Sequence, residues 1–322
     1  MPDPTHTVIV PAYNAAETIE PAIESVRAQT DPSFELIAVD DGSTDATQDL
    51  IRRMAAEDER IRLIRQDNAG PSAAREAAMG RASGTYLTFL DSDDLLMPSY
   101  LETMASTLGA DAAIGLAHAR AWVLDDAAGG GRIRRAVWPP PGYMTGSHDD
   151  PPDPLVALAS GNYVGAVQTA RRNAVERAGG LDAGLGQAED YDLWVRIAAA
   201  GFRIVSAPGT LVVVRNRAGS LSKDELELAR GVRVVCERIL SVYDVPDEAR
   251  AAARRQLERA NREIDLLGGR APARGALRRL RLALGRAKRR LLSGRLWYPV
   301  PPSEVAEAFP ELVRRRAPGA KS

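Results

Sequence analysis

The sequence is short of the residue types that build disulfide frameworks and many metal centres. A single cysteine, Cys236, occurs in 322 residues, which excludes a disulfide framework and a zinc site made of thiolates. The three histidines, His6, His118 and His148, are not spaced as paired ligands, so a histidine-based metal centre is not expected. His118 follows an apolar run, and we expect it to be a buried or edge residue of a strand.

Long apolar runs are also missing. No stretch of 18 apolar residues occurs, so no membrane-spanning helix is predicted. The first residues lack both the basic and the apolar region of a secretory signal, and we therefore expect a cytoplasmic protein. Hydrophobic residues make up 45% of the chain, enough for one large domain, or one domain and an extension, around a sizeable core.

The net charge of −1 hides an uneven distribution. From Arg250 to the end, nineteen Lys and Arg residues stand against six Asp and Glu residues, so the preceding part of the chain is acidic. Such an asymmetry favours an acidic catalytic body followed by a basic segment.

The first 110 residues alternate between strand and helix patterns. We expect strands over residues 7–10, 35–40, 61–65 and 85–90, with helices between them. Ser43, Thr44 and Asp45 are predicted to cap the second helix, and Ser72 to cap the third, which should close at Gly84. This alternation predicts an α/β fold with a mostly parallel sheet and helices on both faces.

Acidic residues follow two of these strands, where open α/β sheets bind their ligands. Asp40 and Asp41 form either a turn with a helix cap or part of a site. The second cluster holds three carboxylates, Asp91, Asp93 and Asp94, directly after an apolar strand; such charges repel one another unless a cation is present. Mg²⁺ and Mn²⁺ are commonly held in this way, by carboxylates together with substrate phosphates. Neither a dinucleotide-binding glycine fingerprint nor a P-loop follows the first strand.

Four blocks in order resemble family 2 glycosyltransferases, over roughly residues 5–222. The first three are VIVPAYNAAETIEPAIESVRAQT, FELIAVDDGSTDAT and RQDNAGPSAAREAAMGRASGTYLTFLDSDDLLMP, which are similar to the nucleotide-sugar half of that family. The fourth, GNYVGAVQTARRNAVERAGGLDAGLGQAEDYDLWVRIAAAG, resembles its acceptor half. The resemblance implies a GT-A-like fold and an inverting, metal-dependent transfer from a nucleotide-diphosphate sugar, most often a UDP-sugar.

The resemblance also implies roles for residues of the donor half. Tyr13 would lie near the nucleotide base, Asp41 would accept a hydrogen bond from the base, and Asp93 would bind Mn²⁺ or Mg²⁺ directly. Asp91 would face the ribose or sugar and assist at the metal. The remaining residues assigned to the donor nucleotide are Pro11, Ala12, Asp40, Asn68, Gly70, Arg75 and Ser92.

On the acceptor side, the resemblance makes Asp190 the catalytic base. Asp190 and Glu189 can equally be the acidic first turn of a helix, where the dipole favours a carboxylate, and we expect Asp190 to be ionised at pH 7. Trp194, one helical turn beyond Asp190, is either a core residue or a platform for a sugar. Asn162 is either a turn residue or a wall of the sugar pocket.

One block departs from the family pattern. Arg215 and Arg217 stand in VVVRNRAGSLS, where the family often has arginine followed by histidine. A guanidinium cannot ligate a metal, so Arg217 can offer only charge to the diphosphate. The Q-x-x-R-W signature of processive synthases is absent, which favours transfer of one sugar per encounter.

Two divisions of the chain follow from these patterns. We expect a catalytic domain over residues 1–222, with a nucleotide-sugar half to about residue 110 and an acceptor half from about 111, and a helical extension over residues 223–322. In the extension, a basic amphipathic helix over residues 274–297 either binds an anionic membrane surface at the inner face of the cell membrane or packs on the catalytic domain. No nucleic-acid module is recognised.

The predicted function is transfer of one sugar to a saccharide or lipid-linked acceptor in cell-surface polysaccharide or glycolipid synthesis. A nucleotidyltransferase shares the sheet and the carboxylates, but it normally has a glycine-rich loop with a basic residue where this chain has PAYNAAE. A non-catalytic nucleotide-sugar-binding module is expected to lose the base or the D-x-D motif, and both are present here.

Overall fold

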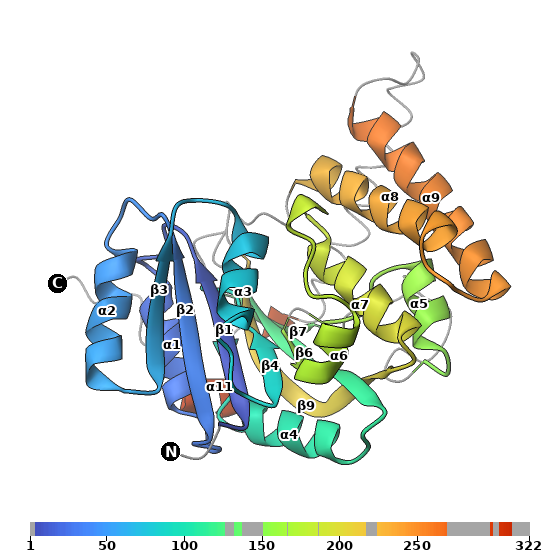
Figure 1. Cartoon of the computed structure of the whole chain (residues 1–322). Helices are drawn as coiled ribbons and strands as arrows, with labels where there is room; N and C mark the ends of the chain where they lie inside the picture. Colours follow the sequence, from blue (N-terminus) through green and yellow to red (C-terminus); the bar gives the residue numbers. More distant parts are fainter. Residues whose placement is uncertain are drawn as a thin grey trace.

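The computed structural model describes residues 4–125, 132–136, 151–165, 167–185, 187–216, 224–268, 297–298 and 303–310. At its centre is one mixed sheet with helices on both faces (Figure 1). This arrangement confirms the predicted α/β fold class. Arg217 and the basic segment from residue 274 to 296 lie outside the described residues.

Four parallel strands make up the first part of the sheet. They are β1 (His6–Ala12), β2 (Phe34–Asp41), β3 (Ile61–Gln66) and β4 (Tyr86–Phe89), arranged in the order β3-β2-β1-β4. Their side chains alternate between two apolar clusters, one on each face: Val8 and Val10 of β1 belong to one cluster and Ile9 to the other. The parallel strands predicted from the sequence are thus confirmed to within one or two residues.

The remaining strands pair mostly antiparallel. β8 (Gln168–Arg171) joins β4 to β6 (Ile114–Asp125), and β6 pairs with β7 (Arg132–Ala136). β9 (Arg203–Asn216) runs parallel to β6, whereas β5 (Leu95–Leu96) pairs antiparallel with β9 and β10 (Trp297–Tyr298) with β7. His118 is buried within β6, edge-on to Tyr163, as expected of a strand histidine.

Helices cover each face of this sheet. On one face lie α1 (Ile19–Arg27), α2 (Thr47–Glu57) and α4 (Tyr100–Gly109); on the other lie α3 (Pro71–Met79), α5 (Pro154–Ser160), α6 (Arg172–Arg177) and α7 (Glu189–Ala199), with a 3₁₀ turn at Ala183–Leu185. In α1, Ile19, Ile23 and Val26 are fully buried, which is the stripe that their spacing predicts.

Two helix starts differ from the prediction. Ala46, not a polar residue, precedes α2. Of the side chains expected to cap this helix, Asp45 accepts a hydrogen bond from the backbone N–H of Thr47, the first helical residue, at 3.0 Å, whereas Ser43 accepts one from Asn14 N in another loop. Helix α3 begins at Pro71, before Ser72, because Gly70 takes a positive φ of 89° and proline fits the first helical position. The helix also ends at Met79, short of Gly84.

Helices from the C-terminal part of the chain pack beside α5 and α7. Helices α8 (Glu225–Ser241) and α9 (Asp247–Leu267) pack against each other, and their apolar residues join the cluster that also contains α5 and α7. A short helix, α11 (Ser303–Ala308), buries Val305 among residues of β5, β6 and β9. Among the described residues, no helix is both long and apolar enough to cross a bilayer.

Candidate active site

The strand order brings the carboxyl ends of three strands together. β1 lies between β2 and β4, so the residues after each strand meet at one edge of the sheet. Strand order reverses at this point, and open α/β sheets bind ligands where it does so. Tyr13, Asp41 and Asp91, which the sequence analysis assigned to the donor, all lie at this edge.

After β1, the chain presents a single aromatic ring. Tyr13 is 52% exposed, whereas Pro11 and Ala12 are buried in the sheet. Asn14 adopts a positive φ of 48° and accepts a hydrogen bond from Thr44 N, which ties this loop to the one after β2. Of the three residues predicted beside the base, Tyr13 is therefore the one whose side chain is available for stacking.

The two aspartates at the end of β2 each fix a loop. Asp41 accepts hydrogen bonds from Gln66 Nε2 at 2.7 Å and from the backbone N–H groups of Ala69 and Gly70, both at 2.9 Å. Asp40 is completely buried and accepts one from Ser43 N at 3.2 Å. Asp40 and Asp41 therefore both hold loops in place through hydrogen bonds. The hydrogen bond between Asp41 and the nucleotide base stays a prediction.

The loop over residues 67–70 lies close to the turn after β2. A side chain at Gly42, which has a φ of 75°, would place its Cβ 2.8 Å from Asn68 N, so only glycine allows this approach. Asn68 is exposed on the loop and Gly70 leads directly into α3. The predicted nucleotide loop is thus held at the carboxyl edge of the sheet.

A tight turn after β4 carries the D-x-D motif. Asp91 has a side chain that is 53% exposed, and Ser92 and Asp93 are half-buried. Asp94 is buried and accepts a hydrogen bond from Arg215 N, at 3.0 Å, which brings the end of β9 to this turn. Burial and the negative charges of Asp91 and Asp93 raise the pKa of Asp94 well above its ordinary value.

Arg75 joins this turn to the acceptor half of the sheet. Its Nη2 lies 2.7 Å from Asp91 Oδ1, and its Nη1 lies 2.7 Å from Glu189 Oε1. Burial lowers the pKa of Arg75, but the charges of Asp91, Glu189 and Asp190 outweigh it and raise the pKa above its ordinary value. One guanidinium therefore neutralises carboxylates from both halves.

A small cavity of about 50 Å³ collects the groups predicted for catalysis. Its lining contains Arg75, Phe89, Asp91, Gln168, Leu181, Asp190 and Trp194. Trp194 is 1% exposed and packs edge-on against Phe89, with ring centroids 5.9 Å apart. The burial of Trp194 therefore supports a role in core packing rather than as a platform for a sugar, although the residue also borders this cavity.

The helix dipole alone would lower the pKa of the carboxylates at the start of α7, but the pKa of both is raised. Burial is the largest influence on both and raises the pKa of Glu189 and of Asp190. For Asp190, Arg75 and a hydrogen bond from Tyr191 N, at 2.6 Å, oppose this rise without cancelling it. A raised pKa makes Asp190 a stronger proton acceptor than an exposed aspartate, provided that it is ionised.

Two further predicted features have local roles. Asn162 Oδ1 accepts a hydrogen bond from Val164 N at 3.0 Å. Asn162 therefore acts as a turn residue, which was one of its two predicted roles. Gly179 and Gly180, both with positive φ, close α6 by donating to Glu176 O and Val175 O.

The fit of a divalent cation rests on the charges of the D-x-D turn. In the described part of the chain, no group of three or more His, Cys, Asp or Glu side chains is arranged to hold a metal. The turn nevertheless carries two carboxylates that are not fully buried, Asp91 and Asp93. Mg²⁺ and Mn²⁺ often take only one or two protein carboxylates and complete their coordination with substrate phosphates. Asp93 and Asp91 fit a site of that kind.

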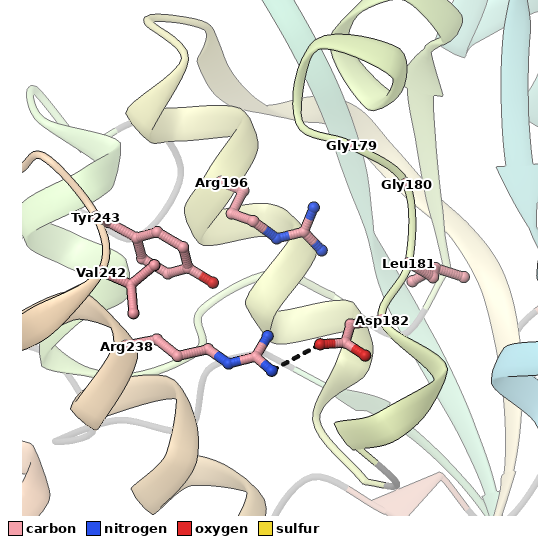
Figure 2. Close-up of a pocket in the computed structure, with 8 residues that line it drawn as sticks. All are labelled: Gly179, Gly180, Leu181, Asp182, Arg196, Arg238, Val242 and Tyr243. Carbon is pink, nitrogen blue, oxygen red and sulfur yellow. Dashed lines mark hydrogen bonds and ion pairs between the residues drawn. The ribbon is translucent and has the colours of Figure 1, made fainter.

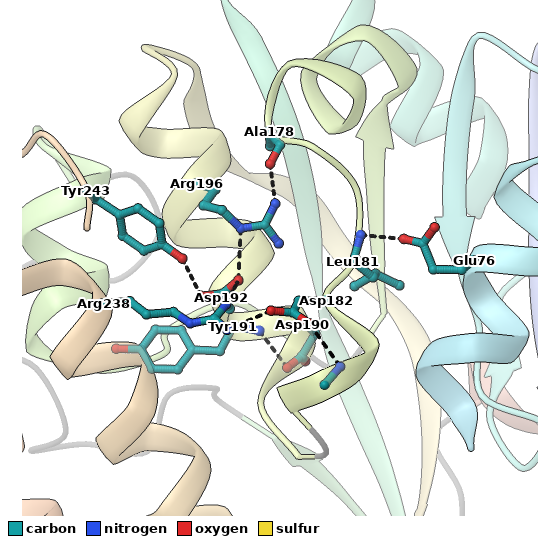
Figure 3. Close-up of polar contacts among 11 residues, drawn as sticks. Glu76, Ala178, Leu181, Asp182, Asp190, Tyr191, Asp192, Arg196, Arg238 and Tyr243 are labelled. Carbon is teal, nitrogen blue, oxygen red and sulfur yellow. Dashed lines mark hydrogen bonds and ion pairs between the residues drawn. The ribbon is translucent and has the colours of Figure 1, made fainter. Parts of the chain in front are cut away.

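Sequence reasoning missed a polar network behind Asp190 (Figure 3). Asp192, which is fully buried, accepts hydrogen bonds from Arg196 Nε at 2.8 Å, Arg238 Nη1 at 3.3 Å and Tyr243 Oη at 2.6 Å. In the sequence, only the i, i+4 spacing of Asp192 and Arg196 on a predicted helix could have indicated this network. Arg238 and Tyr243 follow 46 and 51 residues later, and only the fold brings them here.

Comparison with known proteins relates the site to a family. Residues 7–161 match Glycosyl transferase family 2. The chain is 44% identical over 100 residues to the putative teichuronic acid biosynthesis glycosyltransferase TuaG of Bacillus subtilis, covering 31% of this chain and 40% of TuaG. It is 41% identical over 112 residues to glycosyltransferase GlyA of Streptococcus pneumoniae, covering 34% of this chain and 16% of GlyA. The matched segment thus spans less than half the length of either relative.

Solved structures share the fold at lower identity. Residues 1–349 of S. aureus TarS in complex with UDP-GlcNAc align with a TM-score of 0.63 and 20% identity, covering 81% of this chain and 72% of that TarS fragment. The mannosyltransferase PcManGT from Pyrobaculum calidifontis, in complex with GDP-Man and Mn²⁺, aligns with a TM-score of 0.59 and 22% identity, covering 88% and 80%. By its family match, the segment over residues 7–161 belongs to glycosyl transferase family 2, and the chain has a GT-A-like fold.

Proposed function

We propose that this protein is an inverting, non-processive glycosyltransferase that moves one sugar from a nucleotide-diphosphate donor to an acceptor hydroxyl. The observation that carries the proposal is the double ion pair of Arg75, which joins Asp91 of the D-x-D turn to Glu189. Asp190, the neighbour of Glu189, shares one cavity with Asp91. A proton acceptor thus lies beside the groups assigned to the donor.

In the proposed reaction, Asp190 accepts the proton of the acceptor hydroxyl as the oxygen forms a bond to the anomeric carbon. The bond from that carbon to the diphosphate breaks on the opposite side, and its electron pair leaves with the nucleoside diphosphate. The configuration of the sugar is therefore inverted. A positioned base of this kind contributes about 10²–10⁴-fold to the rate.

Donor binding is assigned to the carboxyl edge of the sheet. Tyr13 would stack on the base, and the loop fixed by Asp41 would lie along the nucleotide. Asp93 and Asp91 would hold Mn²⁺ or Mg²⁺, which stabilises the negative charge of the departing diphosphate. We favour a UDP-sugar, as in the TarS complex with UDP-GlcNAc, although PcManGT was solved with GDP-Man.

The acceptor is proposed to be a saccharide or a lipid-linked saccharide in polysaccharide synthesis. TuaG is named for teichuronic acid, and ExoO of Rhizobium meliloti, 45% identical over 115 residues, is named for succinoglycan. We further propose that residues 1–222 form the catalytic domain, that residues 223–322 extend it, and that the basic segment attaches the protein to the inner face of the cell membrane. Co-sedimentation with anionic liposomes at low and high salt tests this attachment.

A donor screen tests the proposed activity. Release of the nucleoside diphosphate from a panel of UDP-, GDP- and dTDP-sugars is followed with and without Mn²⁺. Release should require the metal and should be lost in Asp93→Ala, whereas Asp111→Ala, which removes an exposed carboxylate, should behave like the native protein. Full release from Asp93→Ala, or in excess chelator, would exclude the D-x-D assignment.

A further inference from the structure

A second, larger hollow shares Leu181 with the small cavity as a lining residue. Figure 2 shows the residues that line this hollow. It measures about 540 Å³, which falls within the range of small-ligand sites. Its polar and apolar walls come from the turn after α6, from α7 and from the end of α8: Leu181, Asp182, Arg196, Arg238, Val242 and Tyr243, beside a glycine pair.

The polar wall of the hollow is fixed before any ligand arrives. Buried Asp192 binds Arg196, Arg238 and Tyr243 from behind, and Arg238 Nη2 also lies 2.6 Å from Asp182 Oδ2 (Figure 3). Arg196 Nη1 donates in addition to Ala178 O. Side chains held by several partners present a preorganised surface, which lowers the entropy cost of binding.

The charges of this wall indicate an uncharged ligand. Two guanidinium groups, Arg196 and Arg238, are matched by two carboxylates, Asp182 and Asp192, so an anion would have to compete with existing ion pairs. Part of the wall remains accessible, because the side chains of Asp182 and Arg238 are 41% and 29% exposed. A carboxylate beside a guanidinium offers an acceptor next to a donor.

Saccharides match this combination of groups. Each hydroxyl of a sugar can both donate and accept a hydrogen bond, and the C–H faces of the ring pack on apolar surface. The glycine pair leaves bare backbone on one side of the hollow, while Leu181 and Val242 supply apolar contacts. Val242 is 68% exposed and is therefore accessible to a ligand at the mouth of the hollow.

Leu181 connects the hollow to the catalytic cavity. Its side chain borders both spaces, and its backbone N–H donates to Glu76 Oε1 at 2.5 Å. Glu76 follows Arg75 in α3, so the helix that bridges the two halves also holds the partition between the two spaces. A chain of sugar units that crosses Leu181 would extend from Asp190 into the hollow.

We propose that this hollow is a subsite for a neutral saccharide, and that it binds the part of the acceptor chain beyond the sugar that reacts. The inference rests on the proposed function, because it takes the acceptor to be a glycan. It assigns recognition of that glycan to the end of α8, through Arg238, Val242 and Tyr243, in addition to residues of the catalytic half.

The test is a substitution that blocks the mouth of the hollow with a larger side chain. Val242→Trp adds bulk at the mouth, and Leu228→Trp is the matched control, since Leu228 is a 41% exposed apolar residue of the same helix that does not border the hollow. Saturation-transfer NMR is recorded on the full chain with neutral oligosaccharides of glucose, galactose, mannose and N-acetylglucosamine. At least one should bind the native protein and Leu228→Trp equally, and Val242→Trp at least tenfold more weakly.

The outcomes separate this inference from the proposed function. It is overturned if no oligosaccharide binds, if Val242→Trp binds as well as the native chain, or if inorganic phosphate alone binds and is lost in Val242→Trp. Melting curves check the fold, and Val242→Phe replaces Val242→Trp if the latter unfolds. Donor hydrolysis by the native chain is measured separately: saccharide binding without hydrolysis of any donor would exclude the activity and leave the hollow as a saccharide site.

Discussion

At the amino end of the parallel strands, Glu35 of β2 is a buried carboxylate with many partners. It accepts hydrogen bonds from Thr7 Oγ1 at 2.7 Å, from Ser83 N and Ser83 Oγ at 2.6 Å each, and from Arg62 Nη1 at 3.3 Å. At the carboxyl end, Glu189 and Asp190 are also withdrawn from water but share the one guanidinium of Arg75 with Asp91. The two ends therefore place carboxylates in opposite surroundings.

The pKa shifts follow this difference. Burial raises the pKa of Glu35, but the hydrogen bonds from Ser83, Thr7 and Arg62 outweigh it, so the pKa is lowered overall. Burial also raises the pKa of Glu189 and of Asp190, and there the opposing partners are too few. The amino end thus stabilises the charge of Glu35, whereas at the carboxyl end burial disfavours the charges of Glu189 and Asp190.

This contrast indicates which end is shaped by function. Groups that are satisfied within the chain serve the fold, and unbalanced groups in a cleft are candidates for chemistry or for ligand binding. It also predicts that equivalent substitutions at the two ends will affect different properties. Removing one carboxylate from each end, and comparing how the stability of each variant depends on pH, should reveal this difference.

The largest effect is expected from Asp190→Asn, which keeps the shape of the side chain and removes the proton acceptor. The rate of sugar transfer should fall about 10²–10⁴-fold, measured by single turnover with saturating donor, while nucleotide affinity is retained. The free energy of unfolding should not decrease, because a neutral amide replaces a carboxylate that burial disfavours.

Asp49→Asn is the matched control for this substitution, since its side chain lies exposed on α2. It should leave both the transfer rate and the stability unchanged. An unchanged single-turnover rate in Asp190→Asn would exclude Asp190 as the base.

A smaller effect, of the opposite kind, is expected from Glu35→Gln. Thr7 and Ser83 all donate to Oε1, where the amide oxygen can replace it, so the amide nitrogen takes the place of Oε2 and meets the guanidinium of Arg62. The hydrogen bond to Arg62 is lost, and a lost hydrogen bond to a charged group costs about 1.5–3 kcal/mol. We therefore expect the urea midpoint to fall with an unchanged slope, and nucleotide affinity to remain native. A stability loss confined to Asp190→Asn would reverse the comparison.

Most of the parallel core could be predicted from the sequence, because its signals are local. Short β-branched strands and the spacing of Ile19, Ile23 and Val26 depend only on neighbouring residues. The start of α2 was only partly predicted, because Ser43 binds a loop 29 residues away, which no local pattern records. Helix α3 begins one residue before Ser72, because Gly70 and Pro71 set its first turn.

The candidate site divides in the same way. Asp91 and Asp190 were named from motifs, but the connection between them depends on Arg75, whose partners lie 16 and 114 residues away along the chain. The network of Asp192 was missed for a related reason, since Arg238 and Tyr243 come from α8 and the residues after it. Sequence motifs suggested the candidate groups, whereas the long-range ion pairs between the segments that carry them could be found only from the fold.

The last and smallest effect concerns pH. Because the native pKa of Glu35 is lowered, its stabilising contribution is fully present above its ordinary value of 4.5 and is lost as the pH falls through the lowered value. The native pKa of Asp190 is raised, so its charge destabilises the native state only above its ordinary value of 3.8. This destabilisation grows as the pH rises from 3.8 to the raised pKa and is complete above it. The two carboxylates thus change stability in different pH windows and with opposite consequences.

Urea denaturation of the native chain, Glu35→Gln and Asp190→Asn between pH 3.5 and 8 measures both windows. The stability deficit of Glu35→Gln should shrink only as the pH falls below 4.5, and the advantage of Asp190→Asn over the native chain should grow as the pH rises above 3.8. Each difference should change by no more than about 1.4 kcal/mol per pH unit, since one proton is involved. A difference between Asp190→Asn and the native chain that does not vary with pH would mean that Asp190 has an ordinary pKa, and the electrostatic contrast between the two ends would then fail.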